Sequence, residues 1–178
     1  DFAFLQQAGA VAGFTVEEAA TVELNGSRVS STRVREALQA ADFVEAEHLL
    51  GRPFAIAGRV VHGQKLGRQL GAPTANVQLK RHRVPLNGVF LVSMELEGVL
   101  QPGVANIGVR PSVKADGFAH LEVHLLDFAG DLYDRRVSVV FHHKLRDEQR
   151  FASLEALKSA IAADVVAARA FWQDQLNS

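Results

Sequence analysis

The feature that most constrains the fold is a change in the spacing of apolar residues at Phe54. From that residue onward, apolar residues alternate with polar ones or form short runs rich in β-branched and aromatic side chains, as β-strands do. The clearest such segments are FAIAGRVV (54–61), GVFLVSMELEGVL (88–100), HLEVHLLDF (120–128) and RVSVVFHH (136–143). Turns rich in Gly, Pro and Asp separate them, as in PLNG, KADG and FAGD. This spacing predicts an antiparallel sheet that closes, or nearly closes, into a small barrel.

Helical patterns flank the strands. Residues 30–51 contain two helix starts: Ser31 or Thr32, and then Asp42 with Glu45 at the spacing of a capping box. Gly51 is a C-terminal stop signal, and Pro53 blocks continuation of the helix, so we expect a domain boundary between residues 50 and 51. Near the other end, Ser153 can cap a helix whose apolar face is spaced by three and four: Leu154, Leu157, Ile161, Val165, Ala168 and Trp172.

Composition excludes several classes of protein. The 178 residues include no cysteine, which removes disulfide scaffolds, thiol nucleophiles and cysteine-based zinc sites and fits a cytoplasmic protein. No apolar run is long enough for a membrane span, and we expect no membrane partner. Residues 51–178 hold 16 basic and 12 acidic residues, a mild excess that suits a small phosphate ligand better than nucleic acid. Because the first residue is Asp1, we interpret the chain as a fragment of a longer protein, and its oligomeric state stays open.

A glycine-rich stretch follows the first predicted strand: GRVVHGQKLGRQLGAPTANVQ, residues 58–78. Its glycines allow backbone amides to approach a phosphate without interference from a Cβ. In an extended backbone Thr74 and Asn76 project to the same side, and a hydroxyl and an amide oxygen are hard ligands suited to Mg²⁺. The stretch is not a Walker A motif. The spacing is consistent with a shelf for a metal-bound nucleotide and equally with a glycine-rich hairpin that holds no ligand.

A second candidate lies on one face of the strand at 120–128. His120, Glu122 and His124 share that face, and the alternate residues share the apolar one. The trio fits a transition-metal site, a single functional base at Glu122 with polar neighbours, or an exposed polar strand face. The nucleotide interpretation further requires Thr74 and Glu122 to converge on one cleft.

Two other stretches carry polar residues of less certain role. ANIGVRPSV (105–113) is interpreted as a short turn-rich stretch, in which Arg110 meets either an anion or a surface carboxylate. FHHKLRDEQRF (141–151) ends with a run of charges that is mostly solvated, with one substrate contact among them.

Taken in order, these motifs resemble the riboflavin kinase module of the bacterial bifunctional riboflavin kinase/FMN adenylyltransferase family. The resemblance covers about residues 51–172 and includes the closing LKSAIAADVVAAR. Upstream, DFAFLQQAG and VSSTRVREAL are similar to the end of the family's α/β adenylyltransferase domain, with Ser30, Ser31, Thr32 and Arg35 matching its phosphate-handling segment. The His-x-Gly-His segment of that domain is absent from this chain, so residues 1–50 would be its remnant.

The resemblance implies a six-stranded antiparallel Greek-key barrel with a C-terminal helix. It also implies transfer of the γ-phosphate of ATP to the 5′-hydroxyl of riboflavin, giving FMN and ADP with Mg²⁺ as cofactor. By motif, Thr74 and Asn76 would hold the metal and nucleotide, and Glu122 would be the base. The other nucleotide residues would be Gly63, Lys65, Gly67, Gly71 and Pro73, and the flavin residues would be Arg146, Glu148 and Phe151. Ser112 stands where the family usually has threonine and keeps a hydroxyl, so we expect no loss of activity.

Two alternatives to a kinase remain. One is a metal-dependent barrel enzyme that uses His120, Glu122 and His124, although neither histidine is a metal ligand in the family. The other is a flavin- or nucleotide-binding module without catalysis.

Overall fold

The structure, a computed structural model, describes residues 1–18, 20–63, 67, 71–79, 84–109 and 119–176. It divides the chain into two compact units, residues 1–31 and 32–178. The first unit contains helix α1 (Phe2–Ala12) and the short paired strands β1 (Glu23–Leu24) and β2 (Ser27–Arg28). Asp1 caps α1, and Gly13 ends it with a left-handed backbone (φ 80°), which glycine adopts without strain.

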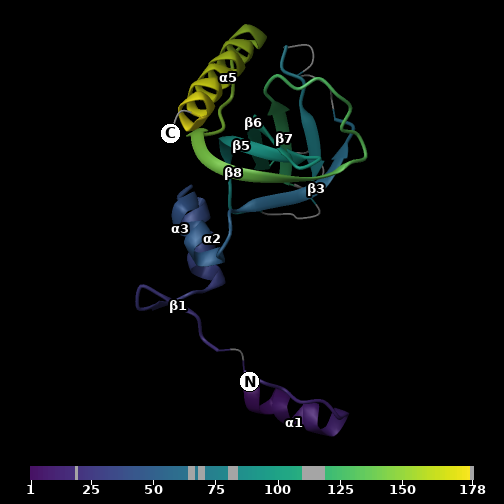
Figure 1. The fold of residues 1–178 in the computed structure, drawn as a ribbon, viewed down its shortest axis with the longest axis vertical. Helices are drawn as coiled ribbons and strands as arrows, with labels where there is room; N and C mark the ends of the chain where they lie inside the picture. Colours follow the sequence, from purple (N-terminus) through teal and green to yellow (C-terminus); the bar gives the residue numbers. More distant parts are fainter. Residues whose placement is uncertain (19, 64–66, 68–70, 80–83, 110–118, 177–178) are drawn as a thin grey trace. The chain divides into compact units, whose positions relative to one another are not determined.

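The second unit is built around a closed barrel of six antiparallel strands (Figure 1). These strands are β3 (Ala55–Val61), β4 (Ala75–Gln78), β5 (Gly88–Leu96), β6 (Val99–Val109), β7 (Ala119–Leu125) and β8 (Arg136–Arg146). Their order around the barrel is β3-β4-β7-β6-β5-β8, and the pairing of β3 with β8 closes it. The predicted mainly-β barrel with a C-terminal helix is confirmed.

The segment predicted as one strand at residues 88–100 is a hairpin. Leu96 pairs with Val99, and the two residues between them, Glu97 and Gly98, both have positive φ angles (54° and 83°). A two-residue turn of this kind matches the twist of a hairpin. Strand β5 is buried along both faces except at its end, which explains why its sequence is a nearly continuous apolar run.

The turn-rich interpretation of residues 105–113 is wrong over the first half, because β6 extends to Val109. Two glycines of β6, Gly103 and Gly108, lie where other segments come close to this strand. A Cβ on Gly103 would lie 2.6 Å from the backbone oxygen of His124, and one on Gly108 would lie 2.6 Å from the carboxylate of Glu148. Arg110, Pro111 and Ser112 lie outside the described residues.

Helices α2 (Ser31–Gln39) and α3 (Phe43–Leu50) precede the barrel. The predicted caps of α3 are confirmed: the side chain of Asp42 accepts a hydrogen bond from the Glu45 amide at 2.9 Å, and Gly51 has φ 68°. Phe43 packs against Phe90 and Phe141 of the barrel, with ring centroids 5.9 and 6.1 Å apart. The compact units divide after residue 31, and the expected division between residues 50 and 51 stays a prediction.

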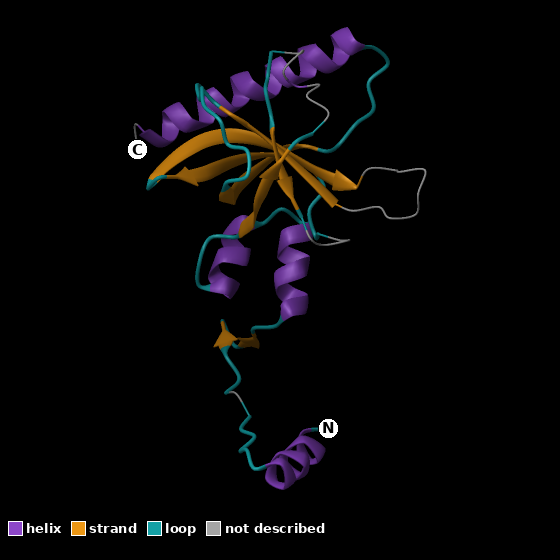
Figure 2. Cartoon of the chain, turned by 90° about the vertical axis from the view of Figure 1, so that its right-hand side faces the viewer, coloured by secondary structure: helices purple, strands orange, loops and turns teal. Residues whose placement is uncertain are grey.

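Helix α5 (Leu154–Leu176) lies along the other side of the barrel from α2 and α3 (Figure 2). The hydroxyl of Ser153 caps it by accepting from the Ala156 amide. Ala168 of this helix joins a buried cluster with Val89, Leu91, Val104 and Leu126, and Val165, Phe171 and Trp172 of the helix pack against it. Leu154, predicted on the apolar face, is 53% exposed because it lies in the first turn of the helix. None of the described helices has the length and apolar content that a bilayer crossing requires.

Candidate active site

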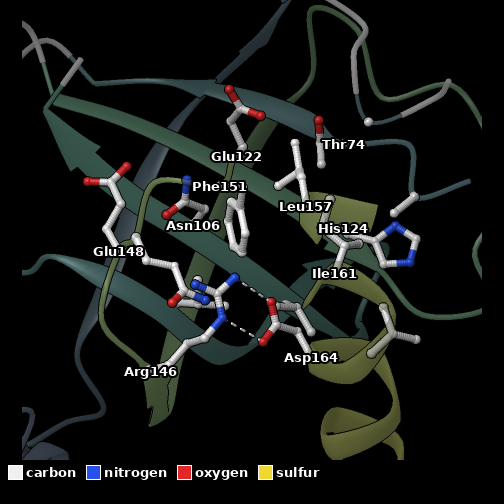
Figure 3. Close-up of a pocket in the computed structure, with 16 residues that line it drawn as sticks. Thr74, Asn106, Glu122, His124, Arg146, Glu148, Phe151, Leu157, Ile161 and Asp164 are labelled. Carbon is white, nitrogen blue, oxygen red and sulfur yellow. Dashed lines mark hydrogen bonds and ion pairs between the residues drawn. The ribbon is translucent and has the colours of Figure 1, made fainter. Parts of the chain in front are cut away.

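A cavity of about 370 Å³ is lined by residues of the barrel wall and of α5 (Figure 3). Strands β5 to β8 contribute Val89, Val104, Asn106, Glu122, His124 and Arg146; the loop after β8 contributes Glu148, Gln149 and Phe151; α5 contributes Leu157, Ile161, Asp164 and Val165. Gly67, Ala72 and Thr74 complete the lining. Thr74 and Glu122, 48 positions apart in the sequence, therefore meet at one cavity.

The register of the sheet aligns three polar residues beside this cavity. Glu122 of β7 is directly opposite Asn76 of β4 on one side and Asn106 of β6 on the other. Directly opposed residues of neighbouring strands project from the same face of a sheet. A row of polar residues thus crosses three strands: Asn76, Glu122 and Asn106. Glu122 and Asn106 line the cavity, whereas Asn76 is next to it in the row but is not part of the lining.

Gly63 and Gly67 provide space for the side chains of Asn76 and Thr74. A Cβ on Gly63 would collide with the Asn76 amide, and one on Gly67 would collide with the Ala72 oxygen and lie 3.3 Å from Thr74 Oγ1. Gly71 instead has a positive φ of 82° with open space around it. The glycine pattern thus has a local cause in addition to any contact with phosphate. Lys65, the remaining predicted nucleotide residue of this loop, lies outside the described residues.

His124 is bonded to the Thr74 segment. Its Nδ1 lies 2.9 Å from the carbonyl oxygen of Pro73. Within the described part of the chain, no group of three or more His, Cys, Asp or Glu side chains could hold a metal ion. The metal-barrel interpretation of His120, Glu122 and His124 is accordingly not favoured.

Arg146 lines the cavity together with Asp164, a partner that sequence reasoning missed. Its Nε and Nη2 donate to the two carboxylate oxygens of Asp164 at 2.9 and 2.8 Å, and its guanidinium lies 5.6 Å from the centre of the Phe151 ring (Figure 3). The pair is largely buried, with side-chain exposures of 24% and 11%. A signal was present, because Asp164 is an acidic residue on the otherwise apolar face of α5.

Asn106 is the second residue that the sequence interpretation left without a role. Its side-chain oxygen Oδ1 is buried and has no hydrogen-bond partner among the described residues. A buried acceptor without a partner is costly unless water or a ligand completes it. Glu148, predicted to contact the flavin, also lines the cavity, with its carboxylate against Gly108.

A second cavity of about 330 Å³ adjoins the first. It is lined by Val60, Pro73, Thr74, Ala75, Val123, Leu125, Phe128, Gly130, Asp131, Leu132 and Tyr133. Tyr133 also stacks on His62, with ring centroids 3.9 Å apart. Thr74 is the residue common to the linings of these two cavities.

The predicted adenylyltransferase residues lie at the division between the two units. Ser30 and Ser31 belong to the first unit, and Thr32 and Arg35 belong to the second. Helix α2 begins at Ser31. A phosphate-handling role for these residues stays a prediction.

Comparison with known proteins supports the assignment of the barrel. The family model for riboflavin kinase matches residues 50–172. The bifunctional riboflavin kinase/FMN adenylyltransferases of Pseudomonas fluorescens and Escherichia coli K12 are 76% and 53% identical to this chain, over 96% and 97% of its length. In each case the chain spans 55% of the relative's length.

A solved structure shares the fold. The crystal structure of a protein described as a macrolide-efflux protein from Streptococcus pneumoniae matches with a TM-score of 0.72 and 35% identity, covering 85% of this chain and 50% of that one. The closed six-stranded barrel agrees with the family match. The chain therefore belongs to the riboflavin kinase family.

Proposed function

We propose that this chain transfers the γ-phosphate of ATP to the 5′-hydroxyl of riboflavin, giving FMN and ADP. The observation that carries the proposal is the position of Thr74, which lines both cavities, while Glu122 lines the first. A kinase needs its phosphate donor and its acceptor alcohol in neighbouring spaces that meet at a metal and a base. The lining shared at Thr74 supports that arrangement.

The first cavity suits the flavin. Phe151, Leu157, Ile161 and Val165 supply apolar surface for a planar ring system, and its volume lies in the range of small-molecule sites. The unpartnered Oδ1 of Asn106 is a ready acceptor for a flavin N–H or a ribityl hydroxyl. Arg146, Glu148 and Phe151 keep their predicted roles as flavin contacts.

The second cavity suits the nucleoside end of ATP. Phe128 and Tyr133 offer aromatic surface in the same lining as Pro73, and Thr74, which also lines the first cavity, is where we place the phosphates. The loop between β3 and β4 contains Gly63, Gly67 and Gly71. These glycines and Lys65 keep their predicted nucleotide roles.

Thr74 and Asn76 are the residues that would hold Mg²⁺. A hydroxyl and an amide oxygen fit the preference of this ion for a few protein oxygens with the remaining sites filled by water and phosphate. The Asn76 amide lies close to the backbone of Gly63, which supports a restricted position for this side chain. When bound, the metal neutralises charge on the transferring phosphate.

Glu122 acts as the base in this mechanism. Its carboxylate accepts the proton of the riboflavin 5′-hydroxyl as the oxygen bonds to the γ-phosphorus and the bond from that phosphorus to the oxygen of ADP breaks. Asn76 and Asn106 are directly opposite Glu122 on the two neighbouring strands, so the proposed metal ligand, base and flavin contact are in one region of the sheet.

The proposal is tested by incubating the purified chain with riboflavin, ATP and Mg²⁺ and separating FMN from riboflavin by chromatography. We expect FMN to form, and we expect Glu122→Gln to lower its rate by about 10² to 10⁴ while nucleotide binding persists. Binding of both substrates with no FMN formed by the wild-type chain would instead identify a binding module. Near-normal turnover by Glu122→Gln would remove the assigned role of the base.

The whole protein is proposed to carry a second activity. Because relatives of nearly twice the length are named for FMN adenylyltransferase as well, the parent of this chain is expected to convert FMN to FAD. The remainder of that domain is then the natural partner of residues 1–50, and a cytoplasmic location remains our expectation.

A further inference from the structure

We propose that His124 is a positioning residue that fixes the Thr74 hydroxyl for the phosphate donor; this rests on the proposed kinase function. The contact that carries the inference is the 2.9 Å hydrogen bond between His124 Nδ1 and the carbonyl oxygen of Pro73. Pro73 directly precedes Thr74, and all three residues lie at the cavities described above.

The hydrogen bond from His124 to Pro73 lies just beyond the last pair of the ladder between β4 and β7. Strand β4 begins at Ala75, which pairs with Val123 of β7. One step further, Thr74 would be opposite His124, but the ladder stops at Ala75, and proline has no N–H with which to extend it. The His124 side chain thus holds, from β7, the backbone immediately beyond the last ladder pair.

Thr74 is confined from a second direction as well. A Cβ on Gly67 would lie 3.3 Å from both Thr74 Oγ1 and Thr74 Cγ2, so the loop backbone passes close to that side chain. The Thr74 side chain is thus close to the Gly67 backbone, while His124 holds the peptide that precedes Thr74. Loss of the anchor would free the Pro73–Thr74 peptide to move, and small displacements of a positioning group reduce phosphoryl transfer.

The chemistry of the bond defines the test. A carbonyl oxygen only accepts, so Nδ1 of His124 must carry a proton. Both the Nδ1–H neutral tautomer and the imidazolium meet this requirement, and the bond therefore needs a donor at Nδ1 and no charge. An asparagine side chain can present an N–H at a similar distance from the backbone, whereas leucine fills a similar volume with no donor.

Steady-state kinetics of His124→Leu and His124→Asn separate donor from volume. We expect His124→Leu to raise the KM for MgATP by about threefold to tenfold, the range of one lost hydrogen bond. The KM for riboflavin should change less, and calorimetric binding of MgADP should weaken in parallel with the MgATP term. His124→Asn should recover MgATP affinity to within about twofold. His120→Leu is the matched control, because His120 flanks Glu122 at the same spacing but lines neither cavity.

A direct structural measurement accompanies the kinetics. In protein labelled with ¹⁵N-histidine, the ring nitrogen shifts of the neutral side chain should identify Nδ1 of His124 as the protonated nitrogen. A proton on Nε2 would overturn the inference even if a variant failed to fold. Equal losses in His124→Leu and His124→Asn, or unchanged MgATP affinity in His124→Leu, would also overturn it. Failure of the wild-type chain to form FMN would instead count against the proposed function.

Discussion

Two bidentate arginine–aspartate pairs allow a sharp test of what burial contributes to this fold. Arg146 binds Asp164 at 2.9 and 2.8 Å, and Arg169 binds Asp127 at 2.6 and 2.7 Å. The second pair is shorter, but its side chains are 47% and 71% exposed, against 24% and 11% for the first. Geometry alone would rank the exposed pair as the stronger one, whereas burial predicts the reverse order.

The expected cost of Asp164→Ala follows from its two charge-assisted hydrogen bonds. Each such bond contributes about 1.5 to 3 kcal/mol, and we take the lower end because Arg146 retains some contact with water, giving about 3 kcal/mol in total. For a chain of this size, that loss lowers Tm by about 6 to 12 °C. Asp127→Ala should lower Tm far less, because water replaces the lost contact and salt screens the pair. The hydrogen bond from Arg169 lowers the pKa of Asp127 below its usual value.

The assay uses the single tryptophan of the chain. Trp172 lies on α5 and packs on His142 and Phe171, so its fluorescence during urea unfolding reports on the helix that carries Asp164. Thermal unfolding in parallel gives Tm for the wild type and both variants. If Asp127→Ala destabilised the protein as much as Asp164→Ala, hydrogen-bond length rather than burial would control these pairs, and our reasoning would be refuted.

Further predictions concern the loop and the pH dependence. Gly63→Ala should keep the fold but displace the Asn76 side chain and raise the Mg²⁺ concentration needed for FMN formation; the control Gly98→Ala, in the turn between β5 and β6, should cost about 1 kcal/mol of stability through its positive φ and leave the Mg²⁺ dependence unchanged. A normal Mg²⁺ titration of Gly63→Ala would contradict the packing argument. Burial lowers the pKa of His142 below its usual 6.5, partly opposed by Glu47. The unfolded chain therefore binds the proton more readily, so stability should fall as pH decreases below about 6.5, and His142→Gln should flatten the slope of Tm against pH between 7.5 and 5. An unchanged slope would show that other groups dominate.

The elements with strong local signals could be predicted from the sequence. The N-cap at Asp42, the stop at Gly51 and the cap at Ser153 depend on residues within one helical turn, and each is present, whereas the Glu45 carboxylate pairs with Arg33 instead of completing a capping box. The barrel was predicted because its strands keep an apolar period of two. The family resemblance then supplied strand number and candidate site residues together.

Other features depend on contacts that no local pattern reveals. Glycine residues in β6 indicate turns by their usual preference, but here they allow the close approach of His124 and Glu148 from neighbouring segments. The bond from His124 to Pro73 joins residues 51 positions apart, and the register that makes Asn106 a neighbour of Glu122 exists only once β6 and β7 pair. Asp164 could have been recognised as unusual on its helix, but its partner could not have been identified.

The contact of Phe43 with the barrel has a practical consequence for producing the kinase alone. Recombinant boundaries are usually placed at the edge of a family match, which here begins at residue 50. Such a cut would remove an aromatic ring that is 8% exposed and leave Phe90 and Phe141 facing solvent. An expression fragment that starts before α2 retains that ring and is the better choice for obtaining folded material.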